Sequence, residues 1–154
     1  PDIVVMGKAL GGGLPIGAFS ASKKLMQKLE DQPKLGHITT FGGNPVIASA
    51  ALTTINEIIS AKLIQQMDKK EKIIRKNLKH PMIKSIRGKG LMLAPTFENS
   101  QIPDLLVPRC IEKGLLLFWL LWEKNAIRIS PPLNISEEEI LLGCKIIKGT
   151  LDEL

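Results

Sequence analysis

The sequence predicts an α/β fold. Strand-like apolar runs alternate with helical patterns along the 154 residues, and this alternation favours α/β or α+β layers over a helical bundle or an all-β sandwich. Hydrophobic residues make up 44% of the chain and charged residues 23%, a balance typical of a globular protein with a buried core. Eight of the thirteen glycines fall within the first 43 residues, which indicates two regions of different structure.

The glycine-rich region carries strand, turn and helix signals in order. Residues 3–7 form an apolar run that predicts a buried strand, and residues 16–21 predict a second short strand. Ser22 is suited to cap a helix over residues 22–30. A loop is expected from about residue 32 to residue 43.

A long helical pattern follows this loop. Asn44-Pro45 predicts its start, because Asn favours the N-cap and Pro the first helical position. Apolar residues then recur at helical spacing, with a break expected near Ser60, to about Leu78. His80-Pro81 ends the pattern, since the residue before proline avoids helical geometry.

The remaining elements are shorter. A strand pair is expected over residues 83–97 and a helix over 104–113 that stops at Gly114. Two strands are expected over residues 115–121 and 126–130. A last helix opens with the capping box of Ser136 to Glu139.

Several function classes are disfavoured by composition. The net charge is +6, and ten cations lie between Lys62 and Lys89. That stretch lacks interleaved aromatics and any recognition motif, so it predicts the solvated face of a helix and no nucleic-acid binding. Cys110 and Cys144 show neither CxxC nor metal-ligand spacing, so we expect free thiols, no metal site and a cytoplasmic location.

The sequence contains no signal peptide and no membrane-spanning run. It begins at Pro1 with a strand-like run following at once and no signal-peptide pattern, so we expect a piece of a longer protein. The longest apolar run, Leu115 to Trp122, has eight residues, whereas a membrane helix needs roughly 20. No membrane partner is expected, and a strand so rich in tryptophan predicts core packing.

Residues 7–18, GKALGGGLPIGA, are the first chemical candidate. Lys8 directly follows the predicted buried strand, so partial desolvation would favour its neutral, nucleophilic amine, as Schiff-base chemistry requires. In a P-loop the lysine follows the glycines and precedes Ser or Thr, whereas Lys8 precedes the glycines and is followed by Ala9. An exposed lysine beside a flexible turn is the structural alternative.

Residues 37–45, HITTFGGNP, are the second candidate. The hydroxyls of Thr39 and Thr40 lie just ahead of a helix start, where free backbone N–H groups and the helix dipole favour a phosphate. A capped structural loop is the alternative.

Residues 126–133, AIRISPPL, are the third candidate, because Arg128 precedes a rigid Pro-Pro and is suited to a bidentate carboxylate pair. A structural salt bridge is the alternative there.

With these motifs the chain resembles the class III aminotransferases of the fold-type-I pyridoxal-phosphate enzymes, and among them the acetylornithine and ornithine aminotransferases. The resemblance runs almost end to end. It rests on PDIVVMGKALGGGLPIGA, TTFGGNPVIASAAL, RGKGLML and IRISPPLNISEEEI.

The resemblance implies a role for each candidate. Lys8 would be the Schiff-base lysine of pyridoxal 5'-phosphate and the group that moves a proton between substrate Cα and cofactor C4′. Thr40, with Thr39 beside it, would contact the cofactor phosphate of the neighbouring subunit, which implies a homodimer. Arg128 would bind the substrate α-carboxylate, with an amino acid and 2-oxoglutarate as substrates.

The resemblance also implies an architecture and its gaps. Residues 1–60 would complete the large cofactor domain and residues 61–154 would form the small C-terminal domain. The aromatic ring, the acid and the glycine turn that this family uses upstream do not occur in this chain, so the chain alone is expected to be inactive. A non-catalytic binding module, and an aminomutase or decarboxylase on the same scaffold, are the alternatives.

Overall fold

The computed structural model describes residues 1–31, 33–34 and 36–154. The chain forms two compact units, Pro1–Ala61 and Lys62–Leu154, called unit 1 and unit 2 here. Part of the loop expected from about residue 32, at residues 32 and 35, lies outside the described residues.

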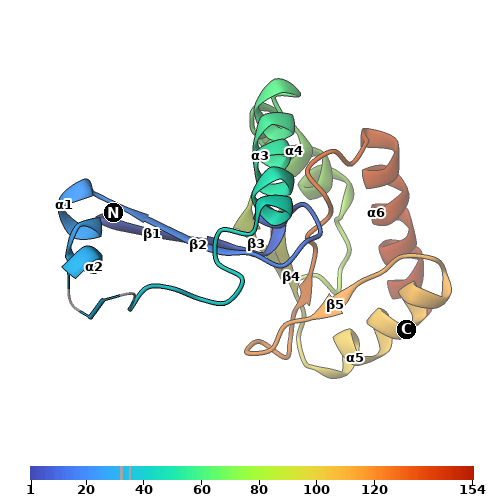
Figure 1. Ribbon diagram of the computed structural model, residues 1–154. Coiled ribbons are helices and arrows are strands. Elements are labelled where there is room, and N and C mark those ends of the chain that lie inside the picture. The colour runs from blue at the N-terminus through green and yellow to red at the C-terminus, as the bar shows by residue number, and fades with distance from the viewer. Residues whose placement is uncertain (32, 35) are drawn as a thin grey trace. The chain divides into compact units, whose positions relative to one another are not determined.

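Unit 1 is built on one antiparallel hairpin (Figure 1). The two strands expected at residues 3–7 and 16–21 both form, and they pair from Ile3↔Ala21 to Gly7↔Gly17. The elements of this unit are β1 Ile3–Gly7, the 3-10 helix η1 Lys8–Gly11, β2 Gly17–Ala21, α1 Lys23–Met26, α2 Lys28–Asp31 and α3 Pro45–Ser60.

The helix starts predicted for unit 1 are confirmed. The Ser22 hydroxyl accepts the Leu25 N–H at 3.4 Å, and the Asn44 side chain accepts the Val46 N–H at 3.0 Å. The single helix expected over residues 22–30 is wrong in one respect, because it divides into α1 and α2 at Gln27.

The prediction that residues 3–7 form a buried strand is wrong. Val5 is 80% exposed and Ile3 is 54% exposed. Among the described residues β1 pairs only with β2, and only Gly11 and Ala51 of unit 1 are buried. The apolar side chains of this hairpin therefore lack a covering layer within the unit.

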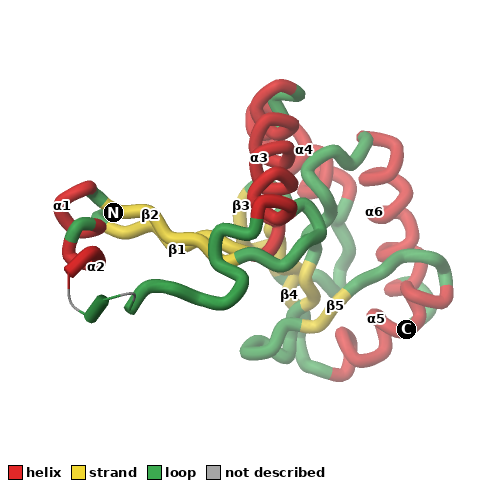
Figure 2. The backbone as a smooth tube through the Cα atoms, in the orientation of Figure 1, coloured by secondary structure: helices red, strands yellow, loops and turns green. Residues whose placement is uncertain are grey.

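Unit 2 alternates helices with short antiparallel strands (Figure 2). Two bridges, Leu93↔Ile129 and Thr96↔Ala126, join the β3–β4 ladder to the segment that contains β6. Its elements are η2 Ile64–Gln66, α4 Met67–Asn77, β3 Ser85–Lys89, β4 Met92–Thr96, α5 Gln101–Glu112, β5 Phe118–Trp119, β6 Ile127–Arg128 and α6 Glu137–Leu151.

The core of the chain lies in unit 2. Helix α6 packs against both α4 and α5, and apolar side chains from these helices meet β4 and β6. Burial of this kind contributes about 25 cal/mol per Å² of apolar surface. The buried side chains of this cluster include Ile74, Leu78, Leu93, Leu106, Val107, Cys110, Ile127, Ile140, Cys144, Ile147 and Leu151.

A carboxylate ties α4 to the β3–β4 turn. Glu71 accepts the Arg75 Nε at 2.7 Å and the Gly90 backbone N–H at 2.6 Å. Arg75 also donates to the carbonyls of Ile86 and Gly88. Strand β3 requires glycine at position 88, because Gly88 has a φ of 104° and a Cβ there would lie 2.0 Å from the Met92 carbonyl oxygen.

The prediction that residues 115–122 pack in the core is wrong for both tryptophans. Leu117 is 5% exposed and joins the core, but Trp119 is 45% exposed and Trp122 is 97% exposed. The strand formed here has only two residues, Phe118–Trp119. After this strand Leu121 and Trp122 are 89% and 97% exposed, so the end of the apolar run adds nothing to the core.

One pair of helices has the length and composition that could cross a membrane, among the residues that the structure describes. Among the described residues no single helix is long and apolar enough to cross a bilayer, and only the bent pair Pro45–Ser60 with Ile64–Asn77 reaches the required length and composition.

Candidate functional site

Lys8 stands where β1 passes into the 3-10 helix η1. Its φ is 48°, in the left-handed region that non-glycine residues seldom adopt and that is found at functional sites. The side chain is exposed, so the expected desolvation of Lys8 is wrong for this chain. The reason is that β1, which is expected from the sequence to be buried, is exposed from Ile3 to Met6.

The glycines after Lys8 set the backbone close to α3. Gly12 has a φ of 58° and donates its N–H to the Ala9 carbonyl at 3.1 Å. A Cβ at Gly12 would lie 2.3 Å from the Thr54 Oγ1, so glycine is required for this approach. Gly13 has a φ of 104° and open space where a Cβ would project. The backbone after Lys8 therefore packs closely against α3 at Gly12, whereas at Gly13 it faces open space.

The Thr39–Gly43 loop is a turn that leads into α3. The Gly42 N–H donates to the Thr39 carbonyl at 3.2 Å, and the Asn44 N–H donates to the Phe41 carbonyl at 3.2 Å. Thr39 and Thr40 are exposed, and no hydrogen bond from either hydroxyl to a described residue is present. Both hydroxyls therefore remain available to a ligand.

The helix N-terminus beside this loop does not offer the free N–H groups that the sequence predicts. The Asn44 side chain accepts both the Val46 and the Ile47 N–H, at 3.0 and 3.3 Å. The Ala48 N–H already donates to the Asn44 carbonyl, and Pro45 has none. A phosphate near this point would depend on the threonine hydroxyls and the loop backbone, since the first turn of α3 is satisfied.

Arg128 lies on β6 of unit 2, directly opposite Phe118 of β5. Its Cζ is 5.1 Å from the centroid of the Phe118 ring. No carboxylate of the described residues lies within salt-bridge distance of its guanidinium, so the structural salt bridge considered from the sequence is not formed among them. The side chain is exposed and free to bind an external anion.

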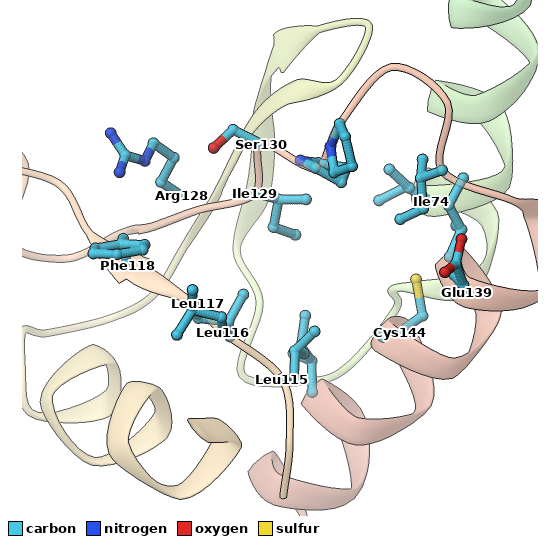
Figure 3. A pocket seen from close by; sticks show the side chains of 16 residues that line it. Ile74, Leu115, Leu116, Leu117, Phe118, Arg128, Ile129, Ser130, Glu139 and Cys144 are labelled. Atoms are coloured by element: carbon cyan, nitrogen blue, oxygen red, sulfur yellow. The ribbon is translucent and has the colours of Figure 1, made fainter. Parts of the chain in front are cut away.

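An apolar cavity of about 400 Å³ lies beside this arginine in unit 2. Figure 3 shows Arg128 and Phe118 at one end of it and Glu139 and Cys144 at the other. The guanidinium is turned away from the apolar side chains that line the cavity. Burial raises the pKa of the Cys144 thiol, so this cysteine is a weak nucleophile at neutral pH.

The predicted site residues are divided between the two units. Lys8, Thr39 and Thr40 lie in unit 1, and Arg128 lies in unit 2. Sequence reasoning missed Phe118 as the neighbour of Arg128, because the contact depends on the β5–β6 register. The only sequence signal for it is an aromatic residue in a predicted strand next to the one that carries the arginine.

Comparison with known proteins identifies relatives over the whole chain. Residues 1–151 match the family model described as aminotransferase class-III. The chain is 37% identical to the acetylornithine aminotransferase of Caldanaerobacter subterraneus subsp. tengcongensis, over 100% of this chain and 39% of that protein. It is 34% identical to the putrescine aminotransferase of Pectobacterium atrosepticum, over 100% of this chain and 34% of that protein.

The fold agrees with solved structures of the same group. The acetylornithine aminotransferase of Elizabethkingia anophelis matches with a TM-score of 0.84 and 33% identity, over 100% of this chain and 39% of that chain. The α/β arrangement of this chain thus matches part of that fold. The chain spans about 39% of the length of the first of these relatives.

Proposed function

The chain belongs to the class-III aminotransferases, a pyridoxal-phosphate-dependent family, and from that premise we propose that it is the C-terminal part of an enzyme that transfers an amino group from an amino acid to 2-oxoglutarate. The observation that carries the proposal is the uncommitted guanidinium of Arg128, which has a ring neighbour but no carboxylate partner among the described residues. An arginine in this state suits the carboxylate that every amino-acid substrate carries.

Unit 1 has groups that fit the cofactor. The Lys8 amine is exposed at the end of β1 and has no hydrogen bond to a described residue, so it can attach to the cofactor aldehyde. The Thr39 and Thr40 hydroxyls are equally open to a phosphate. In the proposal they belong to the site of the neighbouring subunit, which makes the enzyme a homodimer.

Each residue has a distinct task in the reaction. When bound, the cofactor supplies the electron sink for chemistry at the substrate Cα. Lys8 moves the proton between Cα and the cofactor C4′ as a general acid and base. Arg128 binds the α-carboxylate and so orients the Cα–H bond for that transfer.

The two units correspond, in this proposal, to two parts of the enzyme. Residues 1–60 complete the large cofactor domain and residues 61–154 form the small domain. The exposed apolar side chains of the hairpin support this assignment, because Ile3, Val5 and Phe19 are each more than half exposed and would pack against further layers of a larger domain.

The side chain of the amino donor is proposed only by similarity. The relatives described above are named acetylornithine aminotransferase and putrescine aminotransferase. From the first of these names we propose an acetylornithine- or ornithine-like amino donor for this enzyme. The 154-residue chain alone lacks the upstream cofactor contacts of the family, so we propose that it is inactive by itself.

The proposal is tested by an amino-transfer assay on the complete enzyme. Acetylornithine, ornithine and putrescine are each supplied with 2-oxoglutarate and cofactor, and glutamate is measured. Glutamate formation that is abolished in K8A supports the proposal. Release of carbon dioxide or an internal amino shift, with no glutamate, would favour a decarboxylase or an aminomutase, and equal behaviour of K8A and the parent would favour a non-catalytic module.

A further inference from the structure

We propose that Phe118 is a positioning residue for Arg128: its ring holds the guanidinium in the orientation that receives the substrate carboxylate. This inference rests on the proposed role of Arg128. It adds a residue to which neither the family match nor the named relatives assign any task.

The contact is built into the sheet. Strands β5 and β6 are two residues each, and the register places Phe118 opposite Arg128 and Trp119 opposite Ile127. Directly opposite residues project from the same face of an antiparallel pair, so their side chains meet. The Arg128 Cζ lies 5.1 Å from the Phe118 ring centroid, within the roughly 6 Å over which a ring face attracts a cation.

The other three arginines of the chain are held differently. Arg75 donates to Glu71 and to two backbone carbonyls, Arg87 pairs with Glu123, and Arg109 donates to the Glu153 carbonyl. Among the described residues, Arg128 alone of the four is held by a ring face. A ring face orients the guanidinium without occupying its N–H donors, which remain free for a bidentate carboxylate.

The backbone that follows Arg128 is already fixed. The Ile129 N–H donates to the Leu93 carbonyl at 2.8 Å, and the Leu93 N–H donates to the Ile129 carbonyl at 3.0 Å. Beyond the rigid Pro131-Pro132, the buried Lys70 ammonium donates to the Leu133 carbonyl at 2.7 Å. The freedom that remains belongs to the arginine side chain, and the Phe118 contact restricts it before the substrate arrives.

A packing role does not account for Phe118. Its side chain is 48% exposed, whereas Leu117 beside it is 5% exposed and belongs to the core. Trp119 has nearly the same exposure, 45%, but no cation lies over its ring among the described residues. Trp119 is therefore a matched control, an aromatic residue of the same strand and similar exposure without the contact.

The experiment compares four variants. F118L keeps an apolar side chain and removes the ring face, F118Y keeps the ring face, W119L is the matched control, and R128A removes the guanidinium. Each is measured for KM and kcat with amino donor and 2-oxoglutarate in the complete enzyme. The parent chain and the three variants that keep Arg128 are also examined by NMR in the 154-residue chain, where the ring current of Phe118 should shift the Arg128 side-chain protons upfield.

The expected results follow from the strength of each contact. In F118L the ring-current shift disappears and the KM for the amino donor rises about two- to five-fold with kcat nearly unchanged, as the loss of a cation–π contact at an exposed site predicts. F118Y and W119L keep the parent shift and the parent KM. In R128A the KM rises roughly 10- to 150-fold, the range for a lost hydrogen bond between charged groups.

Failure of the inference and failure of the proposed function give different results. If R128A raises KM while F118L keeps both the parent KM and the parent proton shifts, Phe118 does not position Arg128. If F118L lowers kcat and W119L does the same, the effect belongs to strand stability and the positioning role is overturned. If R128A leaves KM unchanged, the carboxylate role of Arg128 fails, and the inference falls with it.

Discussion

Replacing Glu71 with alanine removes the carboxylate that joins α4 to the β3–β4 turn. The Glu71 carboxylate accepts hydrogen bonds from the Arg75 Nε at 2.7 Å and from the Gly90 N–H at 2.6 Å. Among the described residues no other acidic side chain accepts a bond from either donor. Nineteen positions separate Glu71 from Gly90, so the bond fixes a non-local contact. Loss of the carboxylate should loosen the turn against the helix.

The loss of unfolding free energy in E71A depends on the hydrogen-bond partners that Arg75 keeps. A hydrogen bond to a charged group contributes roughly 1.5–3 kcal/mol. The side chains of Arg75 and Glu71 are 34% and 18% exposed, so solvent weakens their pairing, and Arg75 keeps its two carbonyl acceptors after the change. We expect E71A to lower the free energy of unfolding of unit 2 by about 1–2 kcal/mol at pH 7.

The effect should depend on pH in a defined direction. The hydrogen bond from Arg75, and then that from the Gly90 N–H, hold the pKa of Glu71 below its ordinary value of 4.5. The unfolded chain therefore takes up the proton first as the pH falls, and the stabilisation is full above pH 4.5 and is lost as the pH falls through the folded pKa. The difference between the parent chain and E71A should shrink over that acidic range.

The assay is urea unfolding followed by circular dichroism, at pH 7 and at steps down through pH 4.5. E98A is the matched control, because Glu98 pairs with Lys84 at the surface, where the two side chains are 70% and 53% exposed. Its loss should cost less than about 0.5 kcal/mol. An E71A effect no larger than that of E98A, or one that does not change with pH, would show that the Glu71 carboxylate does not stabilise unit 2.

Other substitutions test the local structure of unit 2. S136A removes the hydroxyl that accepts the Glu139 N–H at 3.1 Å and should lower stability by about 1 kcal/mol, whereas S136D should keep most of it; equal urea midpoints for S136A and the parent would contradict the capping role. G88A should destabilise unit 2 by more than about 1 kcal/mol, since the φ of Gly88 is 104° and a Cβ there would meet a carbonyl oxygen. G149A should instead stabilise unit 2 by about 0.5–1 kcal/mol, because Gly149 lies in α6 with open space where a Cβ would project. Thermal midpoints in the order G149A, parent, G88A would confirm both expectations. Burial raises the pKa of the Cys110 and Cys144 thiols, so both should react slowly with a thiol reagent in the folded chain and fast in urea, and rapid labelling of the folded chain would count against the packed core.

Local signals in the sequence predict helix boundaries well. The Asn44-Pro45 start and the Ser136 capping box are both confirmed, because a cap depends on residues within one helical turn. The break near Ser60 and the strand pair within residues 83–97 also occur where the pattern places them. The strand order, by contrast, depends on pairing between residues far apart in the chain.

Burial is where prediction from the sequence fails. Apolar runs at residues 3–7 and 115–122 were expected inside, yet Val5 and Trp122 are 80% and 97% exposed. A hydrophobic pattern reports that a surface favours burial, but it does not report whether the covering surface belongs to the same 154 residues. The desolvation expected for Lys8 depended on the same assumption and failed for the same reason.

The candidate site was partly predictable. Lys8, Thr39, Thr40 and Arg128 were found from motifs, and their tasks remain proposals. Phe118 was missed because the β5–β6 register decides which side chain faces Arg128. The satisfied N-terminus of α3 was missed because the Asn44 side chain can cap the helix and thereby remove the donors on which a phosphate would depend.

The proposed role of Lys8 is tested most directly by locating the cofactor on the polypeptide. The complete enzyme is incubated with pyridoxal phosphate, reduced with borohydride, digested and mapped by mass spectrometry, with K8A treated in parallel. We expect a yellow protein before reduction, cofactor attached to Lys8 after reduction, and no such adduct in K8A. An adduct on another lysine, or none on the parent enzyme, would contradict it.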